Sequence, residues 1–143
     1  MLALELLTYV ELQRGTVAGA VVWAERRHAL AGESFGDRCE AATILSVVLL
    51  SDSGAPPAAA DAVAALLAPF ADGAASIQRV YMLRVAQAML AVVRGDLDAV
   101  DRVTAAWETC REVPAEETIT LDYWLAPLAR VARRAGCLSL IHI

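Results

Sequence analysis

The stretch LLTYVELQRGTVAGAVVWAERR (residues 6–27) decides the fold that we expect for this chain. An apolar segment runs as far as Arg14, Gly15 interrupts it, and a second segment rich in alanine and valine follows at once. Glycine adopts a positive φ without steric cost, so a glycine after a basic or polar residue is a typical helix end. The stretch therefore predicts two helices, over 2–14 and 17–31, joined by a glycine turn.

The same arrangement recurs along the chain. Helix-like segments also precede Gly54, Gly95 and Gly136, so that successive glycines lie 39, 41 and 41 residues apart. Self-similarity at a period of about 20 to 50 residues is typical of solenoids and related repeat arrays. We therefore expect further helices over 38–51, 57–69, 76–94, 97–112 and 116–135.

Local signals support several of these helices. The segment 76–94 carries an apolar stripe at helical spacing, formed by Ile77, Tyr81, Val85, Ala88 and Val92. Asp96 is the expected N-cap of the helix that follows Gly95. Pro127 interrupts the last helix, and because an internal proline removes one hydrogen bond, we expect a kink near Trp124 or a later start.

These patterns together predict an all-α fold. The expected architecture is a right-handed α-solenoid of antiparallel helix hairpins, tetratricopeptide-like, with about seven helices in residues 1–137. The helices would form three hairpins and one unpaired last helix. Because each repeat buries its apolar side only against a neighbour, that last helix should leave apolar side chains uncovered.

The end of the chain, LSLIHI (residues 138–143), does not continue the pattern. In one reading frame this hexapeptide is encoded by CTG TCT CTT ATA CAC ATC, the end of a transposon adapter used in sequencing libraries. We expect a non-native tail here and a fragment of a longer protein in residues 1–137, with Met1 as a possible internal start. A natural apolar tail is the alternative.

Composition and charge limit the classes of partner. The chain has 12 basic residues, all arginine, against 17 acidic ones, and its net charge is −5. Nucleic acid binding through this segment is not expected, because neutralising phosphates requires a basic face. The longest apolar run, Ala41–Leu50, is broken only by Thr43 and Ser46, and it is shorter than the roughly 20 residues of a membrane helix. Three widely spaced cysteines form no disulfide or metal motif, which favours a reducing cytoplasm.

Two stretches resemble a known family. LLTYVELQRGTVAGAVVWAERR (residues 6–27) and AQAMLAVVRGDLDAVDRV (residues 86–103) resemble the tetratricopeptide-like repeats of large bacterial transcriptional regulators of the LuxR type, the MalT-like class. In that family a nucleotide-binding module and a helix-turn-helix domain flank the repeats. This chain has no phosphate loop of the GxxxxGK[ST] type and no lysine to serve one.

The resemblance therefore implies a sensor or scaffold segment inside a transcriptional regulator, without a catalytic centre, cofactor or metal. The implied partners are a protein or small-molecule effector and other domains of the same polypeptide. Two alternatives remain open. One is a helical adaptor of another signalling protein, and the other is a small helical-bundle ligand-binding domain or enzyme. The second would need polar groups that converge inward, with Glu5, Asp37, Glu40 and His28 as the candidates.

A surface for recognition is expected on the first helices of the pairs. Its predicted members are Tyr9, Tyr81, Tyr123, Trp124 and Arg84. Aromatic side chains at helical spacing are also common in cores, so burial is the alternative for each ring. The adjacent Tyr123 and Trp124 should point about 100° apart on a helix, which leaves one of them facing outward.

Other reactive residue types have plain structural explanations. His28 and the arginines Arg26, Arg27, Arg130, Arg133 and Arg134 lie near expected helix ends, where a cation is favoured by the helix dipole. The same arginines could instead contact a phosphate or an acidic partner. Cys39 and Cys110 have no neighbouring histidine or basic cluster in sequence, so we expect buried thiols. Asp96, Asp98, Asp101 and Glu108 lack the frame of a calcium loop, and we expect caps and solvated side chains.

Overall fold

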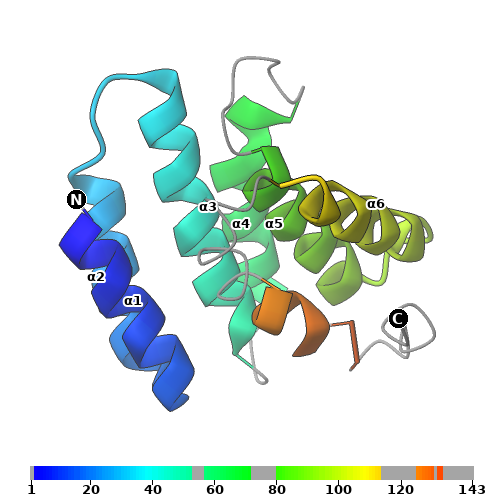
Figure 1. Ribbon diagram of the computed structural model, residues 1–143, viewed down its shortest axis with the longest axis horizontal. Coiled ribbons are helices and arrows are strands. Elements are labelled where there is room, and N and C mark those ends of the chain that lie inside the picture. Colours follow the sequence, from blue (N-terminus) through cyan, green and yellow to red (C-terminus); the bar gives the residue numbers. More distant parts are fainter. Residues whose placement is uncertain (1, 53–56, 72–79, 114–124, 131, 134–143) are drawn as a thin grey trace. The chain divides into compact units, whose positions relative to one another are not determined.

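The computed structural model describes residues 2–52, 57–71, 80–113, 125–130 and 132–133 (Figure 1). All regular structure in these ranges is helical, and they contain no strand. The helices are α1 (Leu2–Arg14), α2 (Val17–Ala29), α3 (Phe35–Ser51), α4 (Pro57–Leu67), the 3₁₀ helix η1 (Ala68–Phe70), α5 (Val80–Arg94) and α6 (Ala99–Arg111). Residues 125–130 and 132–133 are helical as well. The prediction of an all-α fold is confirmed for these residues.

The chain divides into two compact units, Met1–Gln78 and Arg79–Ile143. In the first unit each helix packs against the next one in sequence: α1 against α2, α2 against α3, and α3 against α4 (Figure 1). The central helix α3 contacts neighbours on both sides and carries the longest series of buried side chains, including Ile44, Val47 and Leu50. Burial of a side chain of this size contributes about 1.5 to 3 kcal/mol, so α3 supplies much of the apolar core.

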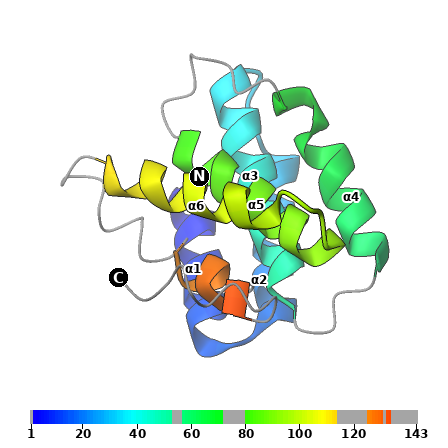
Figure 2. The ribbon, with the colours of Figure 1, turned by 90° about the vertical axis from the view of Figure 1, so that its right-hand side faces the viewer.

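The second unit contains the pair α5 and α6, which pack against each other (Figure 2). The stripe predicted on this segment is confirmed at Tyr81, Val85 and Ala88, which are all buried. Val92 is only half-buried, and Ile77 lies outside the described residues.

Two glycine turns have the same geometry. Gly15 and Gly95 have positive φ angles of 78° and 72°. After α1, the N–H of Gly15 donates to the carbonyl of Leu12 and the N–H of Thr16 donates to that of Glu11, at 3.1 and 2.9 Å. After α5, the two residues that begin at Gly95 make the equivalent bonds, at 3.1 and 3.0 Å. Both turns are Schellman motifs, in which glycine relieves the strain of a left-handed residue.

Two helix starts differ from the prediction. The helix α3 begins at Phe35, three residues before the expected start, because the Ser34 hydroxyl accepts a hydrogen bond from the N–H of Asp37 at 3.1 Å. A serine that caps the first turn in this way fixes the helix end. After Gly95 the N-cap is Asp98 rather than Asp96, and its side chain makes no capping bond. The expectation for Asp96 was therefore wrong.

The packing of the helices agrees only in part with the predicted stack of hairpins. Consecutive helices pack together, but α1 and α3, the first helices of two expected pairs, form no comparable interface with each other. The right-handed solenoid thus remains a prediction. The turns at Gly54 and Gly136, the segment 116–124 and the tail 138–143 lie outside the described residues.

Candidate functional site

Two of the aromatic residues predicted to form a recognition surface are buried instead. Tyr9 and Tyr81 are 6% and 4% exposed, so both rings belong to the core rather than to an open face. Tyr123 and Trp124 lie outside the described residues. Arg84 is exposed, and its guanidinium donates a hydrogen bond to the Thr109 hydroxyl of α6 at 2.5 Å. It therefore braces the α5–α6 pair.

A cleft of about 370 Å³ opens in the first unit, between the end of α2, the start of α3 and the end of α4 with η1. Small and apolar side chains form most of its lining, and an arginine and a histidine join them. The lining residues are His28, Ala31, Phe35, Arg38, Ala42, Ala65, Leu66, Pro69 and Phe70. The size and lining are those of a small-molecule site, for which about 300 to 1,000 Å³ is usual.

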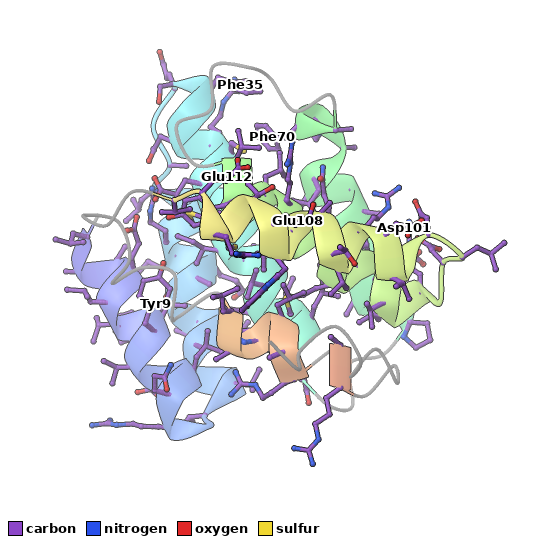
Figure 3. The ribbon with its side chains drawn as sticks, turned by 45° about the vertical axis from the view of Figure 1, so that its right-hand side comes forward. Tyr9, Phe35, Phe70, Asp101, Glu108 and Glu112 are labelled. Carbon is purple, nitrogen blue, oxygen red and sulfur yellow. The ribbon has the colours of Figure 1, made fainter. Side chains whose placement is uncertain are left out.

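Two phenylalanines meet at this cleft. The rings of Phe35 and Phe70 have centroids 5.1 Å apart and planes inclined by 65°, an edge-to-face contact that the aromatic quadrupole favours (Figure 3). Phe70 is buried, whereas Phe35 remains 37% exposed. Phe70 thus anchors the pair, and Phe35 keeps part of its ring open to an incoming molecule.

The polar side chains of the cleft include no acid among the residues that the structure describes. Arg38 and His28 are the titratable lining residues there, and no described carboxylate lines the cleft. Arg38 is exposed, and within the described part of the chain no acidic side chain forms an ion pair with it. In a protein of net charge −5, this is a local reversal of sign.

An ion cluster around the buried side chain of Arg27 joins three helices. In the sequence Arg27 directly precedes the cleft residue His28. Arg27 of α2 is only 1% exposed, and its guanidinium contacts Glu5 of α1 at 2.8 Å and Asp37 of α3 at 2.5 Å. Asp37 also accepts a hydrogen bond from the backbone N–H of Gly32. Arg27 lies in the last turn of α2, as expected, but its side chain is enclosed between α1 and α3 and pairs with acidic groups of the same chain.

The ion cluster shifts the pKa values of its members. The N–H of Gly32, and then the guanidinium of Arg27, hold the pKa of Asp37 below its ordinary value. Burial alone would lower the pKa of Arg27, but its bonds to Glu5 and Asp37 outweigh burial and raise it. Arg27 and Asp37 are thus both charged at neutral pH, and the cluster is an ion-paired tie rather than an acid–base pair.

This arrangement bears on the alternative of an enzyme. Glu5 and Asp37 do converge, as that alternative requires, but Arg27 lies between them and pairs with both. His28 points to the separate cleft instead. No group of three His, Cys, Asp or Glu side chains able to hold a metal ion occurs among the residues that the structure describes.

The thiols predicted to be buried are buried. Cys39 and Cys110 are free and lie in the core, as expected. Burial raises the pKa of Cys110 to about 11, and burial also raises that of Cys39. Since the thiolate is the reactive form, neither has the character of a nucleophile at neutral pH.

Acidic side chains form a stripe on the exposed side of α6. Asp101, Glu108 and Glu112 recur at intervals of seven and four residues and lie along one side of the helix (Figure 3). Nearby, Asp98 pairs with Arg102 at 2.7 Å, one turn further along. Asp101 and Glu108 belong to the solvated helix face that the sequence predicted, and Glu112 is the C-cap of α6. Of the helices that the structure describes, none is long and apolar enough to cross a membrane.

Exposed apolar side chains gather on one side of α1. Leu2, Leu6 and Val10, each four residues from the next, are exposed, and Leu7 is partly so. Leu2, Leu6 and Val10 share one helix face, and it is a different face from that of the buried Leu12. The face resembles that of a helix with a missing neighbour.

The cleft was not recognised in the sequence. Phe35 and Arg38 fall at the predicted boundary of a loop and a helix, and Phe70 follows an expected helix end. No family model, curated protein or solved structure matches this chain.

Proposed function

We propose that this chain is a non-catalytic helical repeat segment that serves as an interaction scaffold and sensor within a bacterial transcriptional regulator. The carrying observation is the pair of Schellman turns at Gly15 and Gly95, which have the same hydrogen bonds and lie two expected periods apart. Two such turns, each between a helix and the next helix that packs on it, support a repeated hairpin.

A repeated hairpin supports an interaction role for a physical reason. Stacked hairpins expose long surfaces and bury few polar groups together, so they commonly bind partners rather than assemble reacting groups. In the polar cluster around Arg27, Glu5 and Asp37 both pair with the guanidinium rather than with an open site. The partner would be a protein or a small-molecule effector in the cytoplasm, acting together with other domains of the same polypeptide.

The regulatory context comes from resemblance. Residues 6–27 and 86–103 are similar to repeats of the MalT-like class, in which ATP and DNA binding belong to flanking domains. This chain would transmit the presence of an effector to such domains. The right-handed solenoid, with its A-helices along one wall, is part of the same proposal.

The test begins with the uninterrupted reading frame around this segment. We expect a phosphate loop upstream and a helix-turn-helix downstream. In a reporter strain, deletion of the segment equivalent to residues 2–113 should abolish the response to inducer, while the purified DNA-binding domain still binds its operator. A normal response of the deleted regulator would refute the proposal, as would a frame that encodes neither flanking domain.

A ligand-binding domain is the second candidate, and the cleft at Phe35 and Arg38 favours it. It differs from the first in one measurable respect. Deletion of a self-contained ligand-binding domain would leave transcription unaltered.

A further inference from the structure

The cleft in the first unit has the dimensions of a site for a small molecule. Its volume of about 370 Å³ is near the lower end for ligand sites, and its lining comes from three separate elements, α2, α3 and α4 with η1. A folded domain or a helix would need a longer and shallower groove. Size therefore points to a compact occupant.

The apolar part of the cleft suits a flat ring. Ala42 and Ala65 leave room, and Leu66 and Phe70 supply apolar contact. Phe35 stands edge-to-face against Phe70 and keeps 37% of its surface exposed. An aromatic group that enters the cleft can pack against the open part of Phe35, with the offset geometry that aromatic pairs prefer.

The polar part of the cleft suits one negative charge. Arg38 has no carboxylate partner among the described residues, and a guanidinium presents a planar fork of donors that matches a carboxylate. Arg38 also lies in the first turn of the 17-residue helix α3, where the peptide dipoles add positive potential. His28 stands at the same cleft and adds no negative charge.

We propose that this cleft binds a small aromatic carboxylate, with its ring against Phe35 and its carboxylate on Arg38. The inference rests on the proposed sensor function, since it names the chemical class of the effector. Charge complementarity carries the choice: a neutral aromatic molecule would leave Arg38 unpaired, and a cation would be repelled by the guanidinium of Arg38.

The experiment titrates the full chain with two isosteric probes, 2-naphthoate and 2-naphthamide, followed by ¹H–¹⁵N NMR. We expect 2-naphthoate to bind about tenfold more tightly, a difference of about 1.4 kcal/mol, and to shift resonances at the end of α2, the start of α3 and η1. Arg38→Ala should abolish the preference for the carboxylate. Arg26→Ala is the matched control, because Arg26 is an exposed arginine outside the cleft, and it should preserve the preference.

A second variant tests the ring contact. Phe35→Leu should weaken both probes by a similar factor of several-fold, because it removes an aromatic contact and leaves the charge. Circular dichroism and urea midpoints of each variant check that the chain is folded. Equal affinity for the two probes, an unchanged preference in Arg38→Ala, or the absence of binding at millimolar probe would overturn the proposal.

Other occupants give distinct results. Tighter binding of the peptide acetyl-Ala-Ala-Phe than of 2-naphthoate would assign the cleft to a peptide C-terminus. Shifts that depend on protein concentration without any probe would assign it to a second copy of the chain. Probe-induced shifts confined to α1 would place binding on its exposed leucines. Each of these results overturns the proposal.

Failure here is separable from failure of the proposed function. A regulator that carries Arg38→Ala and responds normally, beside a segment deletion that abolishes the response, refutes only the cleft. A deletion that leaves the response intact refutes the sensor function itself.

Discussion

Removal of the Arg27 side chain should destabilise the first unit more than any other single charge change. Arg27 is 1% exposed and makes two charge-assisted contacts, to Glu5 at 2.8 Å and to Asp37 at 2.5 Å. Arg27→Ala would leave two partly buried carboxylates beside each other without a cation. Such uncompensated charges are the costly outcome when one member of a buried ion pair is removed.

The magnitude follows from the geometry. Two hydrogen bonds between charged groups contribute about 1.5 to 3 kcal/mol each, and breaking a buried pair typically costs about 3 to 5 kcal/mol. The Asp37 side chain is 27% exposed, so water screens part of the new repulsion. We therefore expect Arg27→Ala to lower the free energy of unfolding by about 3 kcal/mol, near the lower end of that range.

The assay is urea unfolding of the full chain by circular dichroism, with hydrogen exchange to localise the loss to α1, α2 and α3. Arg26→Ala is the control, because the neighbouring arginine is exposed and should cost at most about 0.5 kcal/mol. The triple variant Glu5→Gln, Arg27→Met, Asp37→Asn removes every charge of the cluster and should recover most of the loss. Equal stability of the Arg27→Ala and Arg26→Ala variants would refute the reasoning.

The same cluster predicts a dependence on pH. The folded-state pKa of Asp37 lies below its ordinary value of 3.8, so its ionised form stabilises the fold above that pH. This contribution is lost as the pH falls through the folded-state pKa. The difference in unfolding free energy between the wild type and Asp37→Asn should therefore shrink below about pH 4. A difference that stays constant down to pH 2 would contradict this account.

Three further results are expected. Gly15→Ala and Gly95→Ala should each lower the free energy of unfolding in urea by about 1 to 2 kcal/mol, because a side chain is strained at φ angles of 78° and 72°. Gly36→Ala on α3 is the control. A Cβ there meets open space, so this variant should be neutral or slightly more stable. Cys110 should react with Ellman's reagent at neutral pH only after unfolding, since its pKa is about 11; a fast reaction in the native chain would disprove its burial. Phe70→Ala should lower the free energy of unfolding by about 3 kcal/mol, and Phe70→Leu should restore most of it; equal losses for the two would exclude cavity formation as the cause.

Local signals made much of the helix pattern predictable. Gly15 and Gly95 end helices at the predicted positions because the left-handed residue of a Schellman motif favours glycine at any burial. The start of α3 was placed three residues too late, although Ser34 and Asp37 stand at the spacing of a cap. The capping signal at this position was therefore available in the sequence and was not used.

The candidate site was less accessible to sequence reasoning. Arg27 pairs with Glu5 across 22 residues and with Asp37 across 10, and nothing in the local pattern separates Arg27 from its exposed neighbour Arg26. Tyr9 and Tyr81 share the spacing of a helix face, but that spacing is the same for a core and for an open surface. Tertiary packing decided between these alternatives.

The contacts of Arg27 have a practical consequence for dissection of the chain. The period of the glycines suggests a cut after Gly15 as a natural boundary between pieces. Such a cut would separate Glu5 from Arg27 and leave an arginine in a half-open interior with one counterion. A fragment meant to fold by itself must therefore keep Leu2 through Asp37 in one polypeptide, whatever the repeat boundaries are.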